Sequence, residues 1–173
     1  MFSGLLIAGL VVGGRWYVAN LPDREVRADA TAEVRFEPVK FDADAAAPLR
    51  IAGALRLTST EPRLGGVSAL AVDGDALLAL TDSGVVIRFP KPTRERHIAA
   101  FHDLPDGPGS VRFKAGRDSE ALTRDARGRG WWVAFENRHA VWLFDRDFAR
   151  VERRIGLGRL GWRDNKGAEG MLS

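Results

Sequence analysis

The stretch RDSEALTRDARGRGWWVAFENRHAVWLFD, from Arg117 to Asp145, decides the fold class of this chain. It contains three short apolar runs, SEALT, WWVAF and AVWLF, which are separated by segments rich in Gly, Asp, Asn and Arg. Runs of this length between turn segments predict β-strands, and the short turns predict that successive strands are antiparallel. The charged segment RVERRI, residues 150–155, follows and predicts a fourth strand at a sheet edge.

The same order of strands and turns occurs earlier, in GGVSALAVDGDALLALTDSGVVIRF, residues 65–89, followed by RHIAAF, residues 96–101. In this alignment Ala69 matches Ala121, and Asp73 matches Asp125. A third copy begins at NKGAEGMLS, residues 165–173. Four short strands repeated every 40 to 50 residues, roughly, are typical of the blades of a β-propeller.

We therefore expect an all-β chain that forms an incomplete β-propeller of four-stranded blades. It would hold about two full blades, some N-terminal strands and the start of a third blade, and residues 50–59 would close the last blade. Strands covered on both faces should be continuously apolar, as ALLAL and WWVAF are, whereas an outer strand can be charged. A two-sheet sandwich is the alternative, but it favours regular alternation and requires no repeat.

The N-terminal residues 1–22 form a separate apolar segment, which predicts a signal or an anchor. Its apolar run, Leu5 to Val12, has the length of the core of a signal peptide and is short for a membrane span. We expect export to the periplasm or the cell exterior, with the segment either cleaved or kept as a membrane tether. A buried helix of a cytoplasmic protein is the alternative. Residues 23–49 would form a linker with an edge strand, and residues 50–173 the propeller domain.

Composition excludes several other classes of protein. Charged residues make up 28% and hydrophobic residues 45% of the chain, which is typical of a globular domain that folds by itself, and we expect a monomer. The net charge is only +3, and the tryptophans lie inside apolar runs, so no nucleic-acid partner is predicted. There is no cysteine, which excludes disulfides and thiolate chemistry.

Acidic residues recur at one end of the predicted strands. Glu120 starts the first strand of its repeat and Glu136 follows the second, so antiparallel pairing should make them neighbours. By the same reasoning Asp82 and Glu169 lie at this end of the adjacent repeats. Such carboxylates repel one another. They would be neutralised either by a hard divalent cation such as Ca²⁺ or Mg²⁺, or by ion pairs with the nearby basic residues Arg117, Arg138 and Lys166.

Three segments of the chain resemble the phytase-like propeller family, described as having the esterase-like activity of phytase. They are RLTSTEPRLGGVSALAVDGDALLALTDSG, DSEALTRDARGRGWWVAFENRHAVWLFD and NKGAEGM, which are similar to family patterns of the forms D-x-E-G-L, F-E-x-x-H and N-x-G-x-E. Ala121 stands where the family more often has glycine. Members of this family are longer, so the resemblance implies that the chain stops inside its third blade.

The resemblance implies hydrolysis of a small phosphate ester with the help of a divalent cation, for instance Ca²⁺. It assigns the cation to four carboxylates: Asp82, Glu120, Glu136 and Glu169. It assigns catalysis to Glu120, Glu136 and His139, and substrate binding to Arg138, Asn165 and Lys166. His139 and Asn165 are also common turn residues, so a structural role is the alternative for both. For the whole protein, the alternative is a non-catalytic exported propeller that binds a ligand or a protein.

Overall fold

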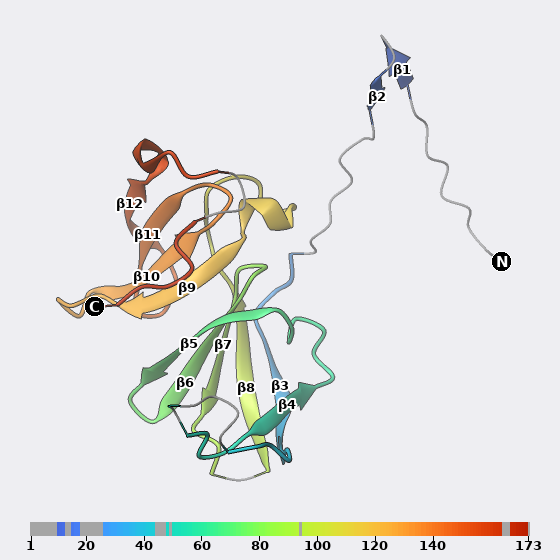
Figure 1. Cartoon of the computed structure of the whole chain (residues 1–173), viewed down its shortest axis with the longest axis vertical. Coiled ribbons are helices and arrows are strands. Elements are labelled where there is room, and N and C mark those ends of the chain that lie inside the picture. Colours follow the sequence, from blue (N-terminus) through green and yellow to red (C-terminus); the bar gives the residue numbers. More distant parts are fainter. Residues whose placement is uncertain are drawn as a thin grey trace.

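The computed structural model describes residues 10–12, 15–17, 26–43, 48, 50–93, 95–163 and 167–172 (Figure 1). The protein is all-β: the described residues contain strands and two short 3-10 helices, and no α-helix. The strands of the two main sheets are β3 Ala30–Pro38, β4 Leu55–Ser59, β5 Val67–Asp73, β6 Ala76–Thr81, β7 Val85–Pro90, β8 Arg96–Asp103, β9 Ser119–Arg124, β10 Gly130–Phe135, β11 Ala140–Asp145 and β12 Val151–Gly156.

The second repeat forms a four-stranded antiparallel sheet in the order β12-β11-β10-β9. Each strand pairs with its neighbour in sequence, as the short turns predict. The turn between β9 and β10 is held by Asp125, whose carboxylate accepts hydrogen bonds from Arg129 and from the indole nitrogen of Trp132. The predicted strand order of this repeat is confirmed.

The first repeat forms the same arrangement, β8-β7-β6-β5, within a six-stranded sheet whose full order is β4-β3-β8-β7-β6-β5. β3 falls in the segment 23–49, and it has a neighbour on each side, β8 and β4. β4 covers the second half of residues 50–59, the segment expected to close the last blade, and in this structure it pairs with β3; the closing role stays a prediction. The sheet curls so that β3 and β4 bend around one of its faces (Figure 1).

The two sheets pack together through a shared apolar core, and β9 lies against β5 and β6 (Figure 1). The core joins Leu78, Leu80 and Val86 of the first sheet to side chains of the second, including Trp131 and Phe135. A second cluster lies on the opposite face of the first sheet, inside its curl, and includes Val34, Ile87, Phe89 and Phe101.

Burial follows the order of strands within each sheet. Residues 78–81 of β6 are all buried, and so are most residues of β10, whereas the middle of the outer strand β12 is exposed. This gradient agrees with the apolar inner runs and the charged RVERRI segment of the sequence. Because the inner strands are mostly buried and apolar, polar side chains can gather only at the ends of these strands.

At the N-terminus the structure describes only a short antiparallel pair, β1 Leu10–Val12 with β2 Arg15–Tyr17. Residues 1–9, 13–14 and 18–25 lie outside the described part, so the signal or anchor predicted for residues 1–22 falls mostly on residues that the structure does not describe. Within the described ranges, no helix is long and apolar enough to cross a membrane.

Candidate metal centre

The candidate site lies where β9 begins and β10 ends. Glu136, the residue after β10, donates a backbone hydrogen bond of 2.9 Å to the carbonyl oxygen of Asp118, the residue before β9. The first repeat makes the equivalent bond from Asp82 N to Gly66 O at 2.7 Å. In both repeats the pairing register shifts close to this bond. Such irregularities often redirect side chains near functional sites.

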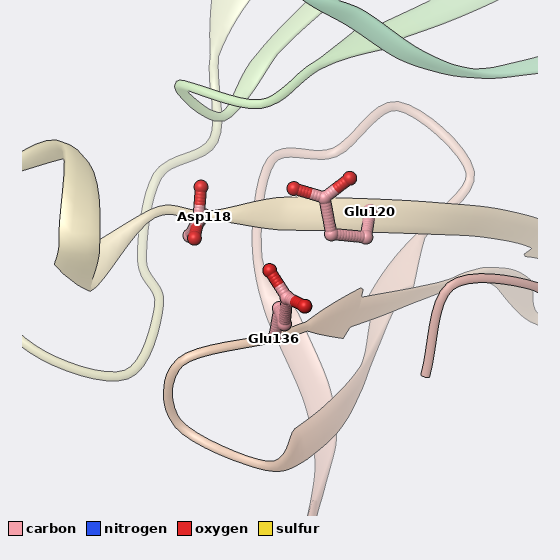
Figure 2. Close-up of side chains that lie close together, drawn as sticks. All are labelled: Asp118, Glu120 and Glu136. Atoms are coloured by element: carbon pink, nitrogen blue, oxygen red, sulfur yellow. The ribbon is translucent and has the colours of Figure 1, made fainter. Parts of the chain in front are cut away.

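Three carboxylates converge at this end of the second sheet. Asp118, Glu120 and Glu136 each offer one oxygen, and these oxygens all lie within 4.8 Å of one another. Figure 2 shows Asp118 and Glu120 on the β9 segment, with the Glu136 carboxylate turned toward the space beside them. The proximity of Glu120 and Glu136 confirms the neighbour relation that the antiparallel pairing predicts.

Burial makes this arrangement electrostatically costly. Asp118 is 6% exposed and Glu136 is 8% exposed, while Glu120 is only partly buried. Burial raises the pKa of Glu120, and the negative charges of Asp118, Glu136 and Asp82 raise it further. The positive charge of Lys114 opposes these effects but does not cancel them. Asp82 therefore belongs to the same electrostatic group, as the repeat predicts.

A lysine from the loop between the sheets pairs with part of this group. Lys114 opens the 3-10 helix η1 Lys114–Gly116, and its Nζ lies 2.7 Å from Asp118 Oδ1 and 3.2 Å from Asp82 Oδ2. Burial alone would lower the pKa of Lys114, but the hydrogen bonds to these carboxylates raise it. Asn137 Nδ2 donates to the other oxygen of Asp118. Asp118 is thus held from two sides.

The carboxylates of Glu120 and Glu136 have no hydrogen-bond or ion-pair partner among the described residues, and Glu136 is the buried one of the two. It is more than nine-tenths buried and directed into the cluster (Figure 2). A buried carboxylate without a partner costs free energy, and proteins usually compensate such a charge with a counter-ion or a metal. The donors around it are carboxylate oxygens, which are the ligands that Ca²⁺ and Mg²⁺ prefer. The residues therefore fit a hard divalent cation.

The other predicted site residues lie outside this triad. Glu169 is exposed. Its segment approaches the site at Gly167, which lies so close to Glu136 that a Cβ added to this glycine would be 2.8 Å from the Glu136 Cα. Glu169 itself is thus not brought to the triad by any described contact. The predicted substrate-binding residues Asn165 and Lys166 lie outside the described residues.

His139 and Arg138 lie in the turn between β10 and β11 and are not part of the triad. His139 has a backbone φ of 43° and packs edge-on against the Trp162 ring, with centroids 6.1 Å apart. The Arg138 guanidinium lies beside Gly109, where an added Cβ would come within 3.2 Å of Nη2. The catalytic role of His139 and the substrate-binding role of Arg138 stay predictions. Arg117, a predicted ion-pair partner, is buried and donates to the backbone oxygens of Gly109 and Gly116.

Sequence reasoning missed two residues of the site, Asp118 and Lys114. The signal for Asp118 was present in the D-x-E spacing, because residues two apart on a strand point to the same side. In the first repeat Gly66 and Ser68 stand at the positions of Asp118 and Glu120. Comparison of the two repeats therefore does not mark position 118 as acidic. Lys114 lies in an irregular loop, and no periodic pattern indicates where its side chain goes.

Comparison with known proteins agrees with the resemblance noted from the sequence. A family model, Phytase-like, described as esterase-like activity of phytase, matches residues 62–173. Neither the curated proteins nor the solved structures gave a match. The matched region contains both four-stranded repeats and the whole acidic cluster. Because the family model covers more than half of the chain, the chain belongs to the phytase-like family.

Proposed function

We propose that this chain is part of a phytase-like β-propeller that hydrolyses phosphate esters with the help of a divalent cation. Asp118, Glu120 and Glu136 would hold the cation, and Asp82 would add negative charge at the rim. The observation that carries the proposal is the convergence of these carboxylates around Glu136, which is buried without a described partner. Family membership supports the same reaction class.

The propeller architecture is part of this proposal. Its support is the repeated four-strand order, the gradient of burial from inner to outer strands, and the packing of β9 against β5 and β6. In a propeller the inner strands surround a central channel. The Asp82 and Asp118 ends of the two sheets would then face one mouth of that channel, where a small phosphate ester could enter.

A divalent cation would polarise the phosphoryl oxygens and make a water molecule more acidic. In the hydrolysis itself, the water oxygen forms a bond to phosphorus, the ester P–O bond breaks, and the alcohol leaves with a proton. Glu120 would be the residue of the triad best placed to take part in proton transfer, because it is partly exposed whereas Asp118 and Glu136 are buried. Before a cation binds, Lys114 and Asn137 contact the two oxygens of Asp118, and Asn137 would keep Asp118 in place afterwards.

The test is hydrolysis of p-nitrophenyl phosphate by the purified chain with Ca²⁺, Mg²⁺ or Mn²⁺ and with a chelator. We expect cation-dependent turnover that is lost in Glu120→Gln and Glu136→Gln. Glu37→Gln is the matched control, because Glu37 is an exposed residue of β3 outside the cluster. Cation binding without turnover in the unsubstituted chain would favour the non-catalytic propeller that binds a ligand or a protein.

We also propose that residues 1–22 direct export and that the chain acts as a monomer, on the sequence pattern alone. Fractionation of expressing cells would test the first point: recovery of the chain only in the cytoplasm contradicts it.

A further inference from the structure

Lys114 connects the acidic ends of the two repeats. Its Nζ contacts Asp118, next to β9, and Asp82, next to β6, at 2.7 and 3.2 Å. The side chain is 44% exposed, so it also reaches the solvent from which a substrate would arrive. No other basic side chain of the described residues forms an ion pair with Asp118 or Asp82.

The charges of the site show why this lysine matters for an anionic substrate. Asp82, Asp118, Glu120 and Glu136 carry four negative charges when ionised, and Lys114 supplies one positive charge. One divalent cation would still leave the group with a net charge of about −1, and without Lys114 the value would be about −2. A phosphate ester is itself an anion, so a cation held by these carboxylates would attract it only weakly.

The Asp118 carboxylate would also have to serve two cations, since Lys114 already contacts its Oδ1. An ammonium and a divalent cation bound to the same carboxylate would lie a few ångströms apart, where their repulsion is large. The Lys114 side chain is long and flexible, and Asp82 lies at the exposed side of the cluster, 34% exposed. Lys114 can therefore keep its contact with Asp82 and direct its remaining donors outward.

We propose that Lys114 is the anion-binding residue of this site and contacts a phosphoryl oxygen of the phosphate ester. The proposal rests on the proposed function, because it assumes a divalent cation at Asp118, Glu120 and Glu136. It gives Lys114 two roles: it neutralises Asp118 and Asp82 in the absence of a cation, and it offsets the excess negative charge when a cation and a phosphate are both bound. Ammonium groups commonly bind phosphate in this way, as point charges.

The test separates cation binding from phosphate binding in Lys114→Gln and Lys114→Arg. Cation affinity would be measured by calorimetric titration with Ca²⁺, and phosphate affinity by titrating inorganic phosphate into the Ca²⁺-loaded chain. Lys91→Gln is the matched control, because Lys91 is an exposed lysine just after β7 and the substitution removes the same charge. Thermal unfolding of each variant would show that it is folded.

We expect Lys114→Gln to bind Ca²⁺ at least as tightly as the unsubstituted chain, because a competing positive charge is removed. Phosphate affinity should fall by about 10- to 100-fold in this variant, and Lys114→Arg should recover much of it. Unchanged phosphate affinity in Lys114→Gln would overturn the role of Lys114 and leave the cation site intact. Absence of Ca²⁺ binding in the unsubstituted chain would instead overturn the proposed function, on which the inference rests.

Discussion

Replacing Glu136 by glutamine should stabilise the protein without cations and remove its stabilisation by cations. Glu136 is 8% exposed, and its carboxylate lies within 4.8 Å of an oxygen of Asp118 and of Glu120. Two like charges about 4.8 Å apart repel by about 3.5 kcal/mol at an effective dielectric constant of about 20. Glutamine has the same shape, and its amide can donate to either neighbour, so the substitution removes the repulsion without leaving a cavity.

The net gain is smaller than the sum of the two repulsions. Lys114 attracts the cluster, and Glu120 is partly exposed, so that solvent screens its charge. We therefore expect Glu136→Gln to raise the free energy of unfolding by about 1 to 3 kcal/mol in the presence of a chelator. For a domain of this size, that gain corresponds to a rise in Tm of roughly 3 to 10 °C.

Calcium should stabilise the unsubstituted chain but not Glu136→Gln, and it should reverse the order of their Tm values at about 1,000 times its dissociation constant, where the gain is about 4.1 kcal/mol. A ligand at about 100 times its dissociation constant stabilises the folded state by about 2.7 kcal/mol, and this gain requires an intact site. Differential scanning calorimetry with chelator and with increasing Ca²⁺ would measure both effects. Glu37→Gln, which removes the same charge from an exposed position of β3, should follow the unsubstituted chain in both conditions.

Two results would refute this reasoning. A lower Tm of Glu136→Gln in chelator would mean that the carboxylate has a stabilising partner and that the cluster is not repulsive. An equal rise in Tm with Ca²⁺ for Glu136→Gln and the unsubstituted chain would mean that the cation binds elsewhere.

Two further predictions concern the fold. Asp73 contacts Arg88 and Arg124, and although burial alone would raise its pKa, these arginines lower it below the ordinary value of 3.8. Asp73→Asn should therefore lower the free energy of unfolding by about 1 to 2 kcal/mol at neutral pH, and the difference should vanish as the pH falls through the lowered pKa; a difference that persists in acid would contradict this origin. In urea unfolding, Leu80→Ala should cost about 2 to 5 kcal/mol because Leu80 is fully buried between the sheets, whereas Leu70→Ala should cost less than about 0.5 kcal/mol because Leu70 is 61% exposed. Similar costs at the two positions would show that Leu70 is covered in solution.

The strands and their order could be predicted from the sequence because local signals agree with one another. Each apolar run is bounded by turn residues, and the Asp73-Gly74 pair marks a hairpin at which Gly74 has a positive φ of 61°. The pairing of β3 with β8 could not be predicted in the same way. These strands are far apart in sequence, and only the free edge of β8 and the burial of Val34 and Phe36 decide the pairing.

The candidate site was partly predictable for a similar reason. Glu120 and Glu136 could be placed together because antiparallel pairing fixes which strand ends meet. Repeat position and the family resemblance predict the same role for Glu169 and Asp82, yet of these two residues the structure brings only Asp82 into the electrostatic group. Repeat position sets where the backbone goes, whereas side-chain direction also depends on the loops between strands.

The loop of residues 104–118 explains why the two repeats differ in chemistry. In the first repeat, Gly66 occupies the place of Asp118, and an added Cβ there would come within 2.4 Å of Asp82 Oδ1. The backbone before β5 therefore approaches Asp82 closely, and a carboxylate at position 66 would collide with it. Before β9, the same backbone position carries Asp118 because the loop supplies Lys114 and the β10–β11 turn supplies Asn137 to hold it. An acidic centre can thus form in one repeat and not in its neighbour, although both share one fold.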